Sequence, residues 1–307
     1  MADPFRGGGY PSLHGSTSRA SQRAQREHFW LLRVRLGGML AGAVGGALLI
    51  SLDWITAGAW VAIIGFSTAL FSEFWSLRQA PERVWYEGRA AAESTKTLTW
   101  RYAVGGTPFG INLNKSVVDA DFLTRTRGVM NDLGSLRASG HAVSPEAITT
   151  EMRRIRSLPF SERKRLYRDG RVVDQQKWYS EKAAQNARIG ARWSVVLIAA
   201  ESFGLIGGII VLTTAVPLDV LGVFAATATA ATSWIQARQH RSLETAYTIT
   251  ALELAAVASE LDTVTDEYEW SGFVGTAEEA ISREHTLWRA SRSPFLHSRP
   301  ASPAAPL

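Results

Sequence analysis

A long apolar stretch, residues 193–235, sets the first limit on how this chain can fold. A transmembrane helix needs about 20 apolar residues, and this stretch divides into two runs of about that length, 193–213 and 218–235. The turn between them ends at Asp219, and Lys and Arg are absent throughout. Apart from Asp219 at the turn, Glu201 is the single formal charge in this stretch. The pattern therefore predicts a transmembrane hairpin that contains one buried carboxylate.

A second pair of apolar runs, 36–52 and 55–75, lies nearer the N-terminus. A signal peptide cleaved near Ala57-Gly58-Ala59 is one alternative, but the first run is long and another span follows it at once. Buried helices of a soluble protein are the other alternative, and four such runs in two tight pairs argue against them. We therefore predict an all-α integral membrane protein with two transmembrane hairpins, extended by long cytoplasmic helices.

Arginine is frequent beside the spans and absent from both turns. The flanking residues are Arg19, Arg23, Arg26, Arg33, Arg35, Arg78, Arg83, Arg89, Arg188, Arg192, Arg238 and Arg241. Because positive residues near spans stay in the cytoplasm, both termini and the central segment 76–192 are predicted to be cytoplasmic. The net charge of +5 fits a multi-pass protein of the cell membrane. The basic residues between Arg153 and Arg165 fit anionic headgroups or solvated faces better than nucleic acid.

The parts outside the spans suggest four divisions of the chain. Residues 1–28 and 291–307 are rich in Gly, Ser, Pro and Arg and are predicted to be disordered tails. The first hairpin and its following helix occupy 29–143, with a kink or a fresh start of the helix at Pro81. The second hairpin, preceded by short cytoplasmic helices, occupies 144–290.

Two stripes with alternating steps of three and four residues predict helices that pack along their length. The first stripe runs from Val172 to Gly190, after a predicted break at Asp169-Gly170. The second predicts one helix from Trp234 to about Glu269. Ser271-Gly272 should then break the chain before a last helix that starts with a capping box at Thr276. Packing within one chain is favoured over a coiled coil with a second copy.

Glycine recurs at four-residue spacing in two of the spans. Gly38, Gly42 and Gly46 form one such series, and Gly204 and Gly208 form another. Small residues on one face allow helix backbones to approach closely in lipid. Association with another copy and packing between spans of the same chain both explain these series.

Residue types that carry catalysis or bind metals are sparse. The chain has no Cys and six scattered His, so the sequence predicts no metal site, no cofactor and no thiolate nucleophile. The pairs Asp262 with Asp266 and Glu278 with Glu279 are interpreted as solvated faces or helix caps. Trp85-Tyr86 and Trp178-Tyr179 are interpreted as helix-packing positions rather than nucleotide-stacking sites. We therefore predict no catalytic residues and no enzyme.

Glu201 is the main candidate for a functional residue. It lies roughly 12 Å into its span at about 1.5 Å per residue, which is near the middle of the bilayer. A carboxylate that faces lipid there costs several kcal/mol, so Glu201 should face other helices or water, or be protonated. One interpretation is a residue that lines a pore. The other is a neutral glutamate bonded to a neighbouring span, for instance to a Thr of residues 227–232.

Three sequence blocks resemble a known family. They are ERVWYEGRAAAESTKTLTWRYAVGGTPF, RKRLYRDGRVVDQQKWYSEKAAQNARIGARW and VGTAEEAISREHTLWRA. The most specific positions are Tyr167, Arg171, Asp174, Gln175, Trp178, Tyr179, Lys182 and Asn186. The blocks resemble the two modules of the SLATT family, the SMODS- and SLOG-associating two-transmembrane effectors, over about residues 30–290.

This resemblance implies a membrane effector of a prokaryotic conflict system. A nucleotide-sensing or nucleotide-making partner would trigger it, and the effector would then form a pore or disrupt the membrane. Residues 1–307 show no pattern of such a nucleotide domain. The partners implied are the lipid bilayer, further copies of the chain and a cytoplasmic nucleotide-signalling protein, and no nucleic acid. The alternative from the residues is a non-conducting membrane scaffold or regulator that docks a cytoplasmic partner through its heptad-patterned helices.

Overall fold

The computed structural model describes residues 3–51, 55–133, 147–214 and 219–292. Among these residues every regular element is a helix, as the all-α prediction requires. The chain divides into two compact units. We call residues 19–85 and 177–251 the span unit, and residues 1–18, 86–176 and 252–307 the polar unit.

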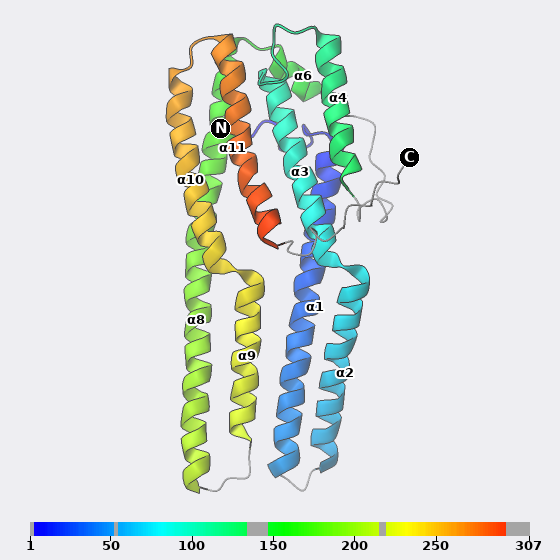
Figure 1. The fold of residues 1–307 in the computed structure, drawn as a ribbon, viewed down its shortest axis with the longest axis vertical. Helices are drawn as coiled ribbons and strands as arrows, with labels where there is room; N and C mark the ends of the chain where they lie inside the picture. Colours follow the sequence, from blue (N-terminus) through cyan, green and yellow to red (C-terminus); the bar gives the residue numbers. More distant parts are fainter. Residues whose placement is uncertain (1–2, 52–54, 134–146, 215–218, 293–307) are drawn as a thin grey trace, which may run out of the picture. The chain divides into compact units, whose positions relative to one another are not determined.

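The span unit contains the four apolar runs. It includes most of α1 (Ser12–Ser51), α2 (Ile55–Gln79), most of α8 (Asp174–Thr214), α9 (Val220–Arg238) and the first half of α10 (His240–Thr263) (Figure 1). Four helices in the described part of the chain are long and apolar enough to cross a membrane, and each overlaps one of the four predicted spans. The prediction of four spans is confirmed. The turns at 52–54 and 215–218 lie outside the described residues.

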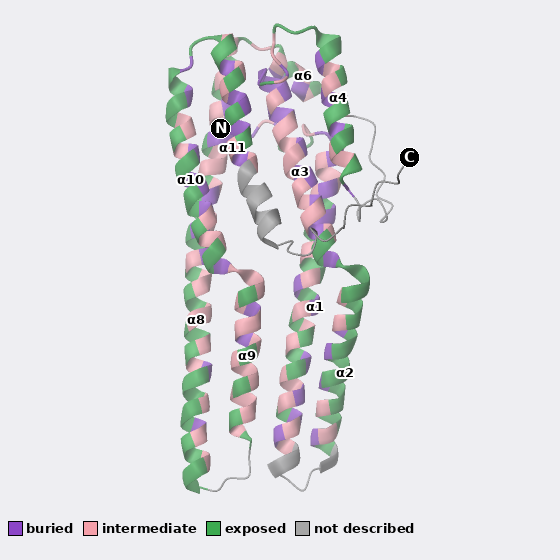
Figure 2. Ribbon diagram, in the orientation of Figure 1, coloured by how far each residue is buried: buried purple, intermediate pink, exposed green. Residues whose placement is uncertain are grey.

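Large apolar side chains cover the outer faces of the spans. Leu70 on α2 is 72% exposed and Leu212 on α8 is 88% exposed, and Figure 2 shows long exposed stretches on both helices. In water such a surface would be very unfavourable, because each large apolar side chain left exposed forgoes roughly 1.5–3 kcal/mol of burial. In lipid the same surface has no such cost. The exposed apolar surface of the spans therefore favours a lipid environment over water.

Within the first hairpin, glycines allow the two helices to touch along their backbones. A Cβ added to Gly38 would lie 2.6 Å from the carbonyl oxygen of Gly65 on α2. A Cβ added to Gly45 would lie 2.5 Å from the amide nitrogen of Ala62. Real side chains do not tolerate such distances, so only glycine permits this approach. Ser72 on α2 adds a hydrogen bond to the Leu31 carbonyl at 2.7 Å.

The polar unit is a bundle of shorter helices around an aromatic core. Its helices are most of α3 (Pro81–Val104), α4 (Lys115–Asn131), α6 (Thr150–Arg156), α7 (Phe160–Tyr167), the π-helical segment η1 (Arg168–Val173) and α11 (Glu267–Arg292). Trp100 on α3, Tyr167 on α7 and Trp270 on α11 are fully buried. The ring of Tyr167 lies 5.7 Å from that of Trp100 and 5.6 Å from that of Trp270, both edge to face. These contacts join three helices that are distant in sequence.

The predicted disorder of residues 1–28 is wrong for residues 3–28. Helix α1 already begins at Ser12, and Phe5 and Leu13 are only 1% and 2% exposed. The ring of Phe5 packs edge to face on Trp100 at 4.9 Å. The segment has few apolar residues, but the core of the polar unit buries them. Local composition does not show this, because the contacts come from a helix about 90 residues away.

The predicted break at Asp169-Gly170 is also wrong. The helix continues from Phe160 to Thr214, and residues 168–173 form a π-helical segment within it. Gly170 permits a close approach there, since an added Cβ would lie 2.9 Å from Pro4 Cδ and 3.3 Å from Trp100. The glycine therefore serves packing rather than a turn. By contrast Pro81 does start a new helix, as the sequence predicted, since α2 ends at Gln79.

The single helix predicted from Trp234 to about Glu269 is in fact interrupted twice. Gln239 adopts a left-handed conformation (φ 49°) and separates α9 from α10. Helix α10 then ends at Thr263, and the Asp266 carboxylate accepts hydrogen bonds from the first amides of α11. The predicted break at Ser271-Gly272 is absent, because α11 passes through it. The predicted tail at 291–307 lies outside the described residues from 293 onward.

Candidate functional site

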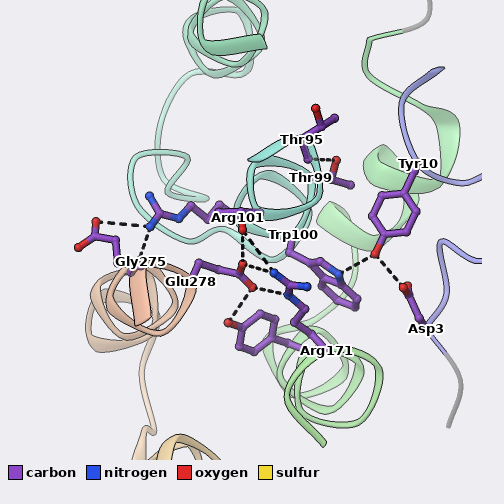
Figure 3. A network of polar contacts seen from close by, with 12 residues as sticks. Asp3, Tyr10, Thr95, Thr99, Trp100, Arg101, Arg171, Gly275 and Glu278 are labelled. Atoms are coloured by element: carbon purple, nitrogen blue, oxygen red, sulfur yellow. Dashed lines mark hydrogen bonds and ion pairs between the residues drawn. The ribbon is translucent and has the colours of Figure 1, made fainter. Parts of the chain in front are cut away.

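The polar unit contains a buried ion pair between Arg171 of η1 and Glu278 of α11 (Figure 3). Their side chains are 1% and 0% exposed. Arg171 binds the carboxylate through two bonds, Nε to Oε1 at 2.8 Å and Nη2 to Oε2 at 2.7 Å. Tyr167 and Thr97 donate to the same carboxylate at 3.1 and 2.9 Å. All the acceptor positions of Glu278 are thus engaged, as a buried carboxylate requires.

A second chain of hydrogen bonds ties the N-terminal segment into this centre. Trp100 Nε1 donates to the Tyr10 hydroxyl at 3.1 Å, and that hydroxyl donates to Asp3 Oδ2 at 2.7 Å (Figure 3). The other oxygen of Asp3 accepts from the Phe5 amide at 3.0 Å. Burial and the neighbouring Asp3 carboxylate raise the pKa of Tyr10 well above its usual value. The hydroxyl therefore stays protonated and keeps both bonds.

Lys96 on α3 adds a further charge to the same region. Burial lowers its pKa, and Arg171 lowers it further, while Glu93, Asp3 and Glu278 oppose the shift. Nη1 of Arg171 is buried and finds no hydrogen-bond acceptor among the described residues. This centre is therefore a coupled set of charges in which the loss of one member leaves another uncompensated. It joins the N-terminal segment, α3, η1 and α11.

The eight family-motif residues divide between the two units. In the polar unit, Tyr167 and Arg171 belong to the buried centre and Asp174 pairs with Arg6 at 2.7 Å. Gln175, also in the polar unit, is half-buried. The motif residues of this unit thus line one continuous segment, from the end of α7 to the start of α8.

In the span unit three of the four remaining motif residues join α8 to α10, whereas the Lys182 side chain donates to Gln185 on its own helix at 2.8 Å. The rings of Trp178 and Tyr179 lie 5.7 and 5.5 Å from Tyr247. Asn186 is buried and shares a 2.7 Å hydrogen bond with His240 Nδ1, while its amide donates to the Lys182 carbonyl. These motif residues thus pack one helix against another here.

Glu201 lies on an exposed face of α8 in the middle of the third span. Ile198, Leu205 and Leu212 share this face and are also exposed. The Glu201 carboxylate forms no hydrogen bond or ion pair within the described part of the chain. Figure 2 shows how much of this half of α8 is uncovered.

The neighbouring span does not supply a partner for Glu201 within the chain. The hydroxyls of Thr227 and Thr229 donate to carbonyl oxygens one turn earlier in α9, both at 2.8 Å. These bonds satisfy the hydroxyls within their own helix, which is the usual behaviour of Thr in a transmembrane helix. The interpretation in which Glu201 bonds to these threonines therefore has no support in the described contacts.

The glycines of the sequence motif have different surroundings. Gly38 and Gly42 face α2, and Gly204 and Gly208 face Phe224 and Leu221 of α9. A Cβ added to Gly46 would meet nothing within 4 Å. The structure thus puts four of these residues at helix contacts within one chain, and it leaves Gly46 open.

The main residue of the buried polar centre that sequence reasoning missed is Glu278. It was interpreted as a solvated face or a cap, and this is wrong because its side chain is fully buried. A signal for its position was present: Val274, Ala277 and Ile281 form a buried stripe at helical spacing, and Glu278 lies on it. Asp262 and Asp266 do lie near the surface, where one pairs with Arg168 and the other caps α11. Among the described residues no group of three His, Asp or Glu could hold a metal ion.

Comparison with known protein families accounts for both halves of the chain. The model described as SMODS and SLOG-associating 2TM effector domain 3 matches residues 11–164, which is half of the sequence. The chain belongs to the SLATT family. A second model, SMODS and SLOG-associating 2TM effector domain 1, matches residues 167–288. No curated protein and no solved structure matches the chain.

The two SLATT domains lie in tandem, as the resemblance suggested. Their boundary falls at 164–167, inside the continuous helix that begins at Phe160, whereas the sequence prediction put it at 143/144. Each domain contributes one transmembrane hairpin. The second match begins at Tyr167, the first residue of the motif and a member of the buried polar centre. The protein is therefore a two-domain SLATT membrane effector.

Proposed function

We propose that this SLATT protein assembles into an oligomer that opens an ion-permeable path through the membrane when a cytoplasmic signal reaches its polar unit. The observation that carries the proposal is the exposed position of Glu201. A carboxylate near mid-bilayer that faces lipid costs several kcal/mol. A second copy of the chain or a water-filled lumen removes that cost. A chain that acts as a monomer has no evident use for such a residue.

The exposed face around Glu201 is suited to helix association. Ile198, Glu201, Leu205 and Leu212 fit a spacing of three, four and seven residues, which is the pattern of a helix seam. In lipid, van der Waals packing and polar contacts drive such association, because there is no hydrophobic effect between spans. We therefore assign this face of α8 to contacts between copies around a lumen.

The signal would enter through the buried polar centre. Arg171 and Glu201 are carried by one uninterrupted helix, Phe160–Thr214. In the π-helical segment that holds Arg171 the backbone hydrogen bonds span five residues instead of four, and such segments often accompany functional sites in helices. A partner that changes the contacts of Arg171 or Glu278 would alter this segment. A nucleotide-signalling protein of a prokaryotic conflict system is the partner we propose, and the effector itself is not an enzyme.

The arginine distribution supports a location in the cell membrane with both termini in the cytoplasm. Each span has an arginine beside the end that is away from its hairpin turn. These residues are Arg35, Arg78, Arg192 and Arg238. Labelling of single cysteines in intact cells tests this orientation, because the chain has no native cysteine. A cysteine at Thr214, exposed at the outer end of the third span, should react with an impermeant reagent, and one at Ser18 should not.

Ion flux in liposomes tests the proposed path. Full-length protein is reconstituted at increasing protein-to-lipid ratio, with and without a panel of cyclic and linear nucleotides, and Glu201→Gln is compared with wild type. We expect flux that rises more than linearly with protein density and falls at least tenfold in Glu201→Gln. Glu260→Gln on the exposed part of α10 is the control and should conduct like wild type.

The competing scaffold function makes a different prediction. A scaffold would be monomeric in mild detergent, conduct nothing under any of these conditions and bind a soluble protein. The heptad positions that such a partner would use are already occupied within the chain, since Tyr179 and Tyr247 pack on each other and Leu254 and Leu261 are buried. Equal flux in wild type and Glu201→Gln would remove the role of Glu201 in conduction.

A further inference from the structure

A pocket in the span unit lies between α1 and the last turn of α9. It has a volume of about 640 Å³. The pocket is lined by residues 25–27, Phe29, Trp30 and Arg33 of α1 and by Arg238 of α9, and Glu27 is the one acidic residue among them. Three guanidinium groups thus face one carboxylate. The pocket is therefore strongly electropositive, and it joins the first hairpin to the second.

The guanidinium groups of Arg33 and Arg238 stack on the same aromatic floor. Arg33 lies 5.2 Å from the ring centroid of Trp234, and Arg238 lies 5.6 Å from that ring and 4.4 Å from Phe29. Stacking uses the flat faces of the guanidinium groups and leaves their N–H edges free. Two like charges are thus held side by side, which is unfavourable unless an anion joins them.

No acidic residue of the described chain neutralises these arginines. Arg26, Arg33 and Arg238 form no ion pair or side-chain hydrogen bond with any described residue. Glu27 accepts a hydrogen bond from Trp75 Nε1 at 3.3 Å. The nearby Arg35 differs, because its guanidinium pairs with Glu73 at 2.6 Å. The pocket therefore retains unused positive charge and unused N–H donors.

The depth of the pocket indicates which anion it meets. Arg33 precedes the first span by three residues and Arg238 follows the fourth span by three, which is about 4.5 Å along a helix. The polar headgroup layer extends roughly 5–7 Å beyond the hydrocarbon core on each side. The two guanidinium groups therefore lie at the level of the lipid phosphates. Trp30, 59% exposed, is typical of this interfacial layer.

We infer that this pocket binds the phosphate group of an anionic phospholipid, with Arg33 and Arg238 as the two ligands and Phe29 and Trp234 as the floor. The bound phosphodiester would neutralise both arginines and hold α1 and α9 together. It would thus join the two hairpins at the membrane surface. A lipid that lacks net negative charge fits less well, because its own ammonium group would lie among three arginines. Phospholipid binding at this pocket does not require that the protein conducts ions.

Native mass spectrometry of the full-length protein tests this site. Delipidated protein in detergent is titrated with phosphatidylglycerol or with phosphatidylcholine of the same acyl chains. We expect at least one tightly bound phosphatidylglycerol per chain and much weaker phosphatidylcholine binding. The double variant Arg33→Gln/Arg238→Gln should lose about thirtyfold in phosphatidylglycerol affinity, roughly the effect of two interfacial arginines. The matched control Arg35→Gln removes one charge at the same depth and should bind like wild type.

Two further arms distinguish the lipid from a soluble anion and from a folding defect. Glycerol 3-phosphate and inorganic phosphate, each at millimolar concentration, should not displace phosphatidylglycerol; displacement by either would overturn the lipid assignment. Equal binding of the two lipids to wild type, or an equal loss in Arg35→Gln and the double variant, would also overturn it. If the double variant does not purify as a single species, the wild-type lipid preference and Arg238→Lys, which keeps the charge, decide the question.

Discussion

The polar unit and the span unit each contain a glutamate away from water, and the two carboxylates differ in whether they have hydrogen-bond partners. Glu278 in the polar unit is fully buried and accepts four hydrogen bonds from Arg171, Tyr167 and Thr97. Glu201 in the span unit lies exposed on a helix that should face lipid, and its carboxylate has no partner among the described residues. A satisfied buried charge belongs to the fold of the single chain. For a charge left without a partner in lipid, we propose that an oligomer or a water-filled lumen supplies its surroundings.

The same contrast extends to how the two units are held together. Aromatic packing and hydrogen bonds between charged groups join the helices of the polar unit. In water, burial of the apolar surface drives this packing. The hydrophobic effect does not act between spans in lipid. Close backbone contacts at Gly38 and Gly45 hold the helices of the first hairpin together instead. The two units should therefore respond differently to the same kind of substitution.

The largest effect is expected for Glu278→Ala. It leaves Arg171 buried without its counter-charge, and breaking a buried pair in this way costs about 3–5 kcal/mol. Thermal unfolding of the purified protein should show a large drop in Tm. The matched control is the adjacent Glu279→Ala, which removes a mostly exposed partner of Arg101 and should change little. A small effect of Glu278→Ala would mean that the ion pair does not hold the polar unit together.

A replacement of the whole pair sharpens this test. The double variant Arg171→Met/Glu278→Leu removes both charges and keeps apolar volume. Such replacements are often neutral or stabilising in other proteins. We expect Tm to recover most of the loss seen in Glu278→Ala, while any response to a signal partner is lost. Failure of Tm to recover would point to the Tyr167 and Thr97 bonds instead of the ion pair.

The next largest effect is expected for Gly45→Ala in the span unit. The added Cβ would lie 2.5 Å from the amide nitrogen of Ala62, so the two helices must separate. Overpacking of this kind costs about 1–3 kcal/mol. The neighbouring Gly46→Ala is the control, since its Cβ meets nothing within 4 Å. Equal Tm values for the two variants would contradict the close contact in the first hairpin.

A smaller, pH-dependent effect is expected for Tyr102→Phe in the polar unit. Burial and the hydrogen bond to Asp119 at 2.6 Å raise the pKa of Tyr102 from 10.0 to about 12. Between these values the folded chain keeps a proton that the unfolded chain releases, so stability falls as the pH rises. Wild type should therefore lose more Tm than Tyr102→Phe between pH 9 and about 11. Parallel pH profiles of wild type and Tyr102→Phe would show that the pKa of Tyr102 is the same in the folded and unfolded states.

The smallest effect on stability is expected for Glu201→Gln. The carboxylate has no contact to lose in the described chain, so the free energy of unfolding of the detergent-solubilised protein should stay within about 0.5 kcal/mol of wild type. Ion flux, in contrast, should fall strongly. A loss of stability as large as that of Glu278→Ala would erase the difference between the two units. It would show that Glu201 serves the fold of the single chain.

The sequence was sufficient for features that depend on local pattern. The four spans follow from runs of apolar residues, and the new helix at Pro81 follows from the geometry of proline. The buried stripe Tyr179, Ala183 and Asn186 follows from heptad spacing. Features that depend on remote contacts were missed. Phe5 and Leu13 are buried by a core that forms elsewhere in the chain, and Gly170 packs against Pro4 and Trp100 instead of ending a helix.

Apolar run length and the near absence of charge within the runs were enough to define a helical membrane protein with four spans. These properties act residue by residue, because each apolar side chain transfers to lipid independently of the others. The role of each charge depended on three-dimensional contacts. Glu278 and Glu201 are the same residue type, the first on a helix rich in polar residues and the second in an apolar span. Their surroundings distinguish them, because a buried charge is stable only where distant segments bring donors to it, and those segments meet only in the folded chain.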